Sequence, residues 1–181
     1  MNLIYKGRYS GRFKQITAHI TGKKVTELCF GDTVIAEFCR LNGIQWKGID
    51  INESFVKTAL KRGYNAQLEN IETLDHFPTA DTCILSGSMY HFHESTEELF
   101  RKMLACAPML IISEPMINLS NNKGIIGNLA KASASINGKK QVFRYTMDSL
   151  TAEMNLLSNK LNFNFRIVKQ FDKDLIIVIN R

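Results

Sequence analysis

The sequence predicts an α/β protein: a doubly wound, mostly parallel sheet of seven strands that ends in an antiparallel hairpin. The first observation is that short, continuous apolar segments alternate with segments whose apolar residues recur at helical spacing, as expected when helices cover both faces of a parallel sheet. The second is that two apolar segments near the C-terminus are separated only by Asp172, Lys173 and Asp174, which is typical of a hairpin. The length of 181 residues fits one core, so we expect a single domain over residues 1–181.

The first half of the chain repeats one unit of helix, glycine and strand. Apolar residues at helical spacing predict helices over residues 11–21, 33–41 and 55–62. The glycines that follow them, at positions where helices commonly end, are Gly22, Gly43 and Gly63. Short apolar segments then predict strands over residues 25–28, 44–51 and 64–68.

The second half continues this alternation and then departs from it. We expect strands over residues 82–85 and 109–112 on either side of a helix over 95–107, whose first turn is acidic and suits the positive end of the helix dipole. The segment 116–145 contains many Asn, Ser, Gly and Lys residues, and we interpret it as an insertion or a substrate lid. A further helix is expected over 147–161, and the strands of the hairpin over 165–170 and 175–179.

The composition is that of a globular protein in a reducing compartment. The net charge of +6 comes from 23 Lys and Arg against 17 Asp and Glu, and these are scattered, which indicates an ordinary solvated surface. The one place where we expect a basic, aromatic surface is residues 5–14. The four cysteines form no CxxC pair, and neither a signal peptide nor a run of roughly 18 apolar residues is visible. We therefore expect a cytoplasmic protein without a membrane partner.

Two strand ends in the first half carry polar residues, and open α/β sheets bind ligands at these carboxyl ends. After the first strand, the turn Glu27-Leu28-Cys29-Phe30-Gly31-Asp32-Thr33 leads into a helix. Gly31 lets the backbone pass close to a ligand, and the free N–H groups of the next helix add a positive potential. The second strand ends at Asp50, about 20 residues after Gly31, where a carboxylate can accept both hydroxyls of a ribose or cap the following helix. These positions predict a nucleotide-like cofactor.

A third polar strand end is the segment from Ser86 to Glu94, at the mouth of the expected pocket. It contains Tyr90, His91 and His93. His91 can act as a base or orient a substrate, although a lone histidine in a loop is usually structural. The gathering of two histidines, a tyrosine and a glutamate at one strand end leaves both interpretations open.

Taken in order, these segments resemble the class I S-adenosylmethionine-dependent methyltransferases of small molecules, over residues 12–115. The turn that starts at Glu27 resembles the first motif of the family, an acidic residue followed by Gly-x-Gly-x-Gly, in which Gly31 is the glycine that is retained. Asp50 corresponds to the acid that binds ribose, and Ile51 to the apolar residue that packs on adenine. The resemblance implies a Rossmann-like methyltransferase fold with S-adenosylmethionine as the cofactor.

Further matches follow in the same order. Asn70, with Ile71 beside it, corresponds to a segment that lies near adenine in the family. The segment that begins at Ser86 resembles the loop after the family's fourth strand. The run Leu110-Ile111-Ile112-Ser113-Glu114-Pro115 resembles the fifth strand, which often ends in Glu-Pro.

The resemblance also implies a role for each residue in methyl transfer by direct displacement at the sulfonium carbon. Glu27 would bind the ammonium group of the cofactor, Gly31 would approach its amino-acid portion, and Asp50 would hold its ribose. The remaining residues of the expected cofactor site are Ile51, Asn70, Ile71 and Ser86. His91 is the candidate base. The second choices for that role are Tyr90, His93 and Glu114.

Two departures from the family pattern affect the expected substrate and cofactor site. Cys29 and Thr33 replace the first and third glycines of the motif, and a Cβ at these positions narrows the approach to the methionine portion. The Asn/Asp-Pro-Pro-Tyr/Phe run of enzymes that methylate exocyclic amines of nucleic-acid bases is absent after the fourth strand. Its absence argues against methylation of a base's exocyclic amine and leaves other macromolecular substrates open. The polar residues of segment 116–145 and the small single domain lead us to expect a small polar acceptor, methylated at oxygen or nitrogen, rather than a nucleic acid.

Three other functions stay open. The altered glycines are compatible with a catalytically inactive methyltransferase-fold protein that binds or regulates. An NAD-type oxidoreductase is compatible with the sheet pattern, but Gly-x-Gly-x-x-Gly is missing and Asp32 would repel a pyrophosphate. A metal hydrolase would use His91, His93 and Glu114, which fall short of a complete ligand set.

Overall fold

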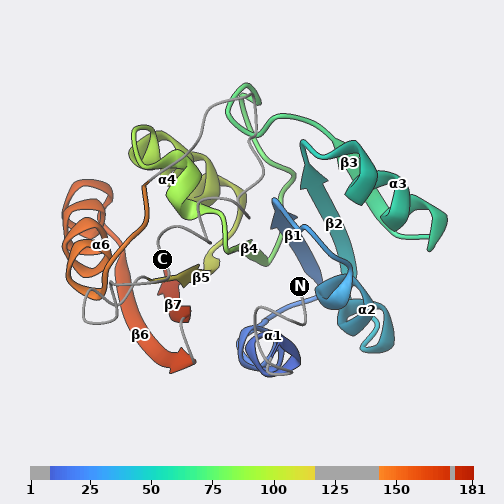
Figure 1. The fold of residues 1–181 in the computed structure, drawn as a ribbon, viewed down its shortest axis with the longest axis horizontal. Helices are drawn as coiled ribbons and strands as arrows, with labels where there is room; N and C mark the ends of the chain where they lie inside the picture. The colour runs from blue at the N-terminus through green and yellow to red at the C-terminus, as the bar shows by residue number, and fades with distance from the viewer. Residues whose placement is uncertain (1–8, 117–142, 172–173) are drawn as a thin grey trace, which may run out of the picture.

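Seven strands form one sheet in the computed structural model, which describes residues 9–116, 143–171 and 174–181 (Figure 1). Their bounds are Lys24–Leu28 (β1), Gln45–Asp50 (β2), Asn65–Leu68 (β3), Thr82–Ser86 (β4), Met109–Pro115 (β5), Asn164–Phe171 (β6) and Asp174–Asn180 (β7). The order across the sheet is β3-β2-β1-β4-β5-β7-β6. The first five strands in this order are parallel, and β7 is antiparallel to both β5 and β6. The predicted fold class is confirmed, including the C-terminal hairpin.

Helices cover both faces of this sheet. The α-helices span Tyr9–Thr17 (α1), Val34–Leu41 (α2), Glu53–Lys61 (α3), Thr96–Cys106 (α4) and Met147–Leu161 (α6), and a 3₁₀-helix spans Met89–Phe92 (η1). In Figure 1, α1 and α2 lie on one side of the sheet and α4 and α6 on the other. Each side has its own apolar core: Ile16, Ile35 and Val56 belong to one, Phe100 and Met154 to the other. None of the helices in the described ranges is both long and apolar enough to cross a bilayer.

The inner strands are buried on both faces, which explains their continuous apolar sequences. The side chains of residues 110–112 in β5 and 175–179 in β7 are at most 1% exposed. β5 continues past its predicted end at residue 112, because Ser113 and Glu114 also pair with β7. The side chains of Ser113 and Glu114 are polar and buried, so they require hydrogen-bond partners. These partners belong to the candidate site described below.

The order of the strands reverses at β1: β2 and β3 follow on one side of it, and β4 and β5 on the other. This strand pairs with β2 on one side and with β4 on the other, so that Glu27 lies opposite Gly48 and Ile84. The carboxyl ends of β1 and β4 are therefore the switch point at which open α/β sheets bind ligands.

Two expectations are revised, and a third lies largely outside the described residues. The basic, aromatic surface is wrong where the structure describes it, because Arg12 and Phe13 are 5% and 4% exposed on a helix that packs against the sheet. The segment after β4, expected as a loop, contains η1. Of the expected lid, residues 117–142 lie outside the described residues, whereas Met116 and Tyr145 at its two ends are buried in the core.

Candidate functional site

The turn after β1 keeps the backbone shape that glycines favour. Cys29 has a φ of 53° and Gly31 a φ of 60°, both in the left-handed region. The Cys29 N–H donates to the carbonyl oxygen of Ile49 (2.7 Å), which holds the strained residue in place. A Cβ at Gly31 would meet no described atom within 4 Å, so the turn presents bare backbone on that side. The substitution of Cys29 for glycine thus changes the side chain but not the course of the chain.

Asp50 joins the end of β2 to this turn. Its Oδ2 accepts the Gly31 N–H (3.1 Å) and its Oδ1 accepts the Asn52 N–H (2.8 Å). The side chain is 6% exposed, and this burial raises the pKa of Asp50 while the backbone donors oppose the rise. Capping of α3 is performed by Asn52, whose Oδ1 accepts from Ser54 and Phe55. Asp50 is therefore not needed as the helix cap.

Glu27 is a buried carboxyl group in the middle of the sheet. It is 1% exposed, and its Oε2 accepts the indole N–H of Trp46 (2.8 Å). Its Oε1 is buried and has no hydrogen-bond partner among the described residues. Burial raises the pKa of Glu27 well above its ordinary value. Sequence reasoning missed Trp46, because only the pairing of β1 with β2 shows that the two side chains are neighbours.

The residues expected near adenine lie in different surroundings. Ile51 is 36% exposed at the end of β2, whereas Ile71 is 3% exposed. Oδ1 of Asn70 accepts the Glu72 N–H (3.0 Å) and so shapes the turn after β3. Ile71 lines a cavity of about 120 Å³ together with Glu72, Phe92, Ser95, Glu98, Leu99 and Lys102.

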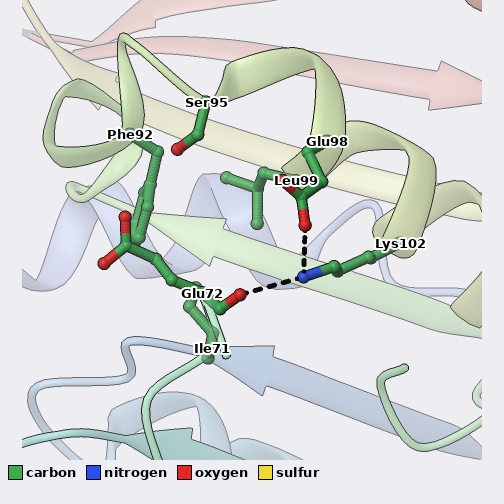
Figure 2. Close-up of a pocket in the computed structure, with 7 residues that line it drawn as sticks. All are labelled: Ile71, Glu72, Phe92, Ser95, Glu98, Leu99 and Lys102. Atoms are coloured by element: carbon green, nitrogen blue, oxygen red, sulfur yellow. Dashed lines mark hydrogen bonds and ion pairs between the residues drawn. The ribbon is translucent and has the colours of Figure 1, made fainter. Parts of the chain in front are cut away.

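Figure 2 shows this cavity between the turn after β3 and the start of α4. The side chain of Lys102 lies at one end of it. Its Nζ donates to the Glu72 carbonyl oxygen (3.0 Å) and pairs with the Glu98 carboxylate (2.8 Å). Ile71, Phe92 and Leu99 provide apolar walls. The cavity is thus lined by both apolar and hydrogen-bonding groups.

The end of β4 is held by an arginine that sequence reasoning did not assign to the site. Arg12 of α1 donates through Nη2 to Ser86 Oγ and through Nε to Ser113 Oγ (3.1 Å). The same Nε lies 3.6 Å from Oδ2 of Asp174 at the start of β7. A Cβ at Gly87 would lie only 2.9 Å from Nη2, so glycine is required beside the guanidinium. Arg12 therefore links α1 to the ends of β4, β5 and β7.

Glu114 holds the short helix that contains His91. Its Oε2 accepts the Met89 N–H (3.0 Å) and its Oε1 accepts the Tyr90 N–H (3.2 Å), at the start of η1. The side chain is 0% exposed, and burial raises the pKa of Glu114 to about 8 against the effect of these donors. The carboxyl group is thus committed to the backbone of η1.

Aromatic rings gather around η1. The His91 ring lies 3.9 Å from the Tyr90 ring, and Cζ of Arg144 lies 3.5 Å from the centre of the Tyr90 ring. The ring of His93 stacks on that of Phe143 at 4.2 Å. His91 is half-buried, whereas Tyr90 is buried. The segment that begins at residue 143 therefore packs directly on the helix that contains His91.

Comparisons with known proteins identify the fold. No protein-family model matches the chain, and no curated protein matches it. Among solved structures, the methyltransferase domain of bacterial CtHen1-CN superposes with a TM-score of 0.69 at 14% identity, over 97% of this chain and 99% of that chain. The chain has the class I methyltransferase fold. Magnesium protoporphyrin IX methyltransferase from Synechocystis PCC 6803 with bound SAM gives 0.67 at 14% identity over 98% and 81% of the two chains. An S-adenosylmethionine-dependent methyltransferase from Mesorhizobium loti gives 0.66 at 15% identity over 94% and 97%.

Within this methyltransferase fold, six of the predicted residues fall into two groups. Gly31 and Asp50 are in direct contact at the end of β1, and Glu27 lies within the same strand. Tyr90, His91 and Glu114 come together at η1. In the part of the chain that the structure describes, no three His, Cys, Asp or Glu side chains are grouped so that they could hold a metal ion.

Proposed function

We propose that the protein transfers a methyl group from S-adenosylmethionine to oxygen or nitrogen of a small polar acceptor. The observation that carries this proposal is the contact between Asp50 and Gly31 at the switch point of the sheet. It places a carboxylate beside a left-handed turn with open backbone, which is the arrangement expected for a ribose next to an amino-acid moiety. The TM-scores of 0.67 and 0.66 with methyltransferases support the proposal at the level of the fold.

The buried carboxyl groups favour a cationic cofactor over a pyrophosphate. At the carboxyl end of the parallel strands, the buried acids of the described chain outnumber its one buried arginine: they are Glu27, Asp50, Glu114 and Asp174. The half-buried Arg144 near Glu114 does not reverse this excess. Burial raises the pKa of Glu27 and of Glu114 and so favours their neutral forms. A bound sulfonium ion with an ammonium group would favour the ionised forms of these carboxyl groups, whereas the pyrophosphate of NAD would oppose their ionisation.

The proposed cofactor contacts follow the strand ends. Asp50 would accept the ribose hydroxyls, Gly31 would lie against the amino-acid portion, and Glu27 would accept its ammonium group. Ile51 and Ile71 would flank adenine, and the cavity beside Ile71 offers room for the edge of the ring. Asn70 and Ser86 would act through backbone position, since their side chains already bond to Glu72 and Arg12. The bound cofactor would supply an electrophilic methyl carbon on its sulfonium.

His91 is the proposed base. As an acceptor oxygen or nitrogen attacks the methyl carbon, the bond from carbon to sulfur breaks and its electron pair stays on sulfur, while the imidazole takes the acceptor's proton. Tyr90 and Glu114 would position His91, because the ring of Tyr90 packs against it and both Glu114 oxygens hold the start of η1.

Calorimetric titration with S-adenosylhomocysteine tests the proposal directly. Replacing Asp50 by Ala should weaken binding by about 1–3 kcal/mol, because the ribose hydroxyls lose a charged acceptor. Asp148→Ala, at an exposed position in α6, is the matched control and should leave the affinity unchanged. Absence of binding to the wild-type protein would overturn the proposal, and equal affinities of wild type and Asp50→Ala would overturn the role of Asp50.

A non-catalytic binding protein of the same fold is the second candidate. Thr33 favours it, because its buried side chain replaces the third motif glycine and its Oγ1 accepts from Arg62, which fixes it at the start of α2. Binding of S-adenosylmethionine without release of S-adenosylhomocysteine, across a panel of hydroxylated and amino acceptors, would favour this candidate over the enzyme.

A further inference from the structure

Glu27 has one satisfied and one unsatisfied oxygen in a dry environment. Its Oε2 accepts from Trp46 at 2.8 Å, and its Oε1 is buried without a hydrogen-bond partner among the described residues. An unsatisfied buried acceptor costs about 1–3 kcal/mol, and more when it is charged. A ligand that donated a hydrogen bond to Oε1 would remove this cost.

The position of Trp46 is set by three neighbours rather than by Glu27 alone. Its six-membered ring lies over Gly48, where a Cβ would come within 2.1 Å of Cη2. Phe30 and Tyr64 contact it edge to face, with ring centroids 5.3 and 6.0 Å away. The indole N–H is therefore held at one place, and Glu27 must orient its carboxyl group to meet it.

We propose that Trp46 is a positioning residue: its N–H holds one oxygen of Glu27 so that the other receives the ammonium group of the cofactor. The inference rests on the proposed function and adds to it the residue that sets recognition of the amino-acid moiety. Trp46 itself touches no part of the cofactor.

The hydrogen bond from Trp46 matters because the other groups that face Glu27 also change its pKa. Asp32 and Asp50 raise the pKa of Glu27 further, Arg12 lowers it, and the thiol of Cys39 in α2 also faces it. The Trp46 N–H is the largest influence that lowers this pKa. Without that donor the carboxyl group stays protonated to higher pH and accepts an ammonium ion less well.

The test compares two ligands that differ in the amino-acid moiety. S-adenosylhomocysteine has the ammonium group, whereas methylthioadenosine lacks the whole moiety and keeps adenosine and sulfur. Trp46→Phe should weaken S-adenosylhomocysteine about tenfold, equivalent to one charged hydrogen bond, and change methylthioadenosine by less than about twofold. The loss should shrink as the pH rises, because Glu27 then ionises even without the donor.

A second replacement removes the donor without changing the ring. Trp46 is the only tryptophan in the chain, so benzothienylalanine supplied in place of tryptophan exchanges the N–H for sulfur at this position alone. It should reproduce the selective loss even if Trp46→Phe fails to fold. Tyr64→Phe is the matched control: it keeps the ring that packs against Trp46, removes only the hydroxyl that bonds to Glu37, and should leave both affinities unchanged.

The outcomes separate this inference from the proposed function. Equal losses for both ligands, or none, would overturn the positioning role of Trp46 while leaving the cofactor site intact. Failure of the wild-type protein to bind either ligand would instead overturn the proposed function and this inference with it.

Discussion

Two single residues shape the site, Gly48 through its missing side chain and Cys29 through its backbone conformation. Gly48 is a strand residue without a side chain, and the ring of Trp46 occupies the space above it. Cys29 accepts a left-handed φ that glycine would adopt without strain. Gly48 is needed because a larger residue would collide with Trp46. Cys29 is tolerated although it has a side chain in a backbone conformation that favours glycine.

Replacing Gly48 by Ala should destabilise the protein by about 2–3 kcal/mol through overpacking. The new Cβ would lie 2.1 Å from Cη2 of Trp46 and 2.7 Å from Cδ1 of Phe30, and neither ring can move far inside the core. Urea unfolding measures the effect. Gly63→Ala is the control, since it has a left-handed φ but no neighbour within 4 Å and should cost only about 1 kcal/mol. A smaller effect at position 48 than at 63 would contradict the packing argument.

At the scale of elements, η1 depends on a carboxyl group in the neighbouring strand. Glu114 of β5 accepts from both Met89 and Tyr90. The guanidinium of Arg144 lies over the Tyr90 ring, and Phe143 stacks on His93, the residue after the helix. A four-residue helix has little stability of its own, so these contacts determine where His91 lies.

Ionisation of Glu114 should make the protein less stable as the pH rises. Its pKa is about 8 in the folded protein, against 4.5 for an ordinary glutamate, so the folded state binds more protons between these values. The free energy of unfolding should therefore fall between pH 4.5 and about 8, by on the order of a few kcal/mol. Unfolding by urea at several pH values measures the slope.

Glu114→Gln provides the comparison for that slope. The glutamine side chain at position 114 cannot ionise, so the stability of the variant should depend less on pH in the same window. A residual slope should come from Glu27, whose pKa is also raised. Identical slopes for the wild type and Glu114→Gln would show that Glu114 is already ionised below neutral pH in the folded state.

At the scale of the whole molecule, one buried ion pair joins the first helix to the last strand. Arg12 of α1 and Asp174 of β7 are both buried, and they meet where β4 and β5 end. Removal of one partner leaves an uncompensated charge in the interior, which is strongly destabilising.

A double-mutant cycle on this pair should show strong coupling. Arg12→Met and Asp174→Asn should each cost about 3 kcal/mol or more, and the double variant should cost less than their sum by about 1–3 kcal/mol. Chemical unfolding of the four proteins measures the coupling. Arg101→Met, which removes an exposed pair with Glu97, should cost at most about 0.5 kcal/mol. Additive effects of the two buried substitutions would refute the link.

The sequence was sufficient to predict the order of elements, because buried parallel strands are continuous apolar segments. Such segments can be recognised without knowing which strands pair with one another. It also indicated Asp50 and Gly31, since both lie at strand ends near one another in the chain. It could not indicate that Arg12 bonds to Ser113 or that Trp46 bonds to Glu27, because such contacts depend on the strand order. For the same reason it could not indicate that Glu114 accepts from the backbone at the start of η1, because its two donors lie in a different segment.

The position of β7 has a consequence for synthesis of the chain. β7 follows β6 in sequence but lies between β5 and β6 in the sheet, and β6 pairs with no other described strand. While the ribosome is still adding residues before position 174, β5 has an open edge and β6 has no partner. β5 can therefore pair with β7 only after residues 174–180 have emerged from the exit tunnel, and only then can Asp174 reach Arg12.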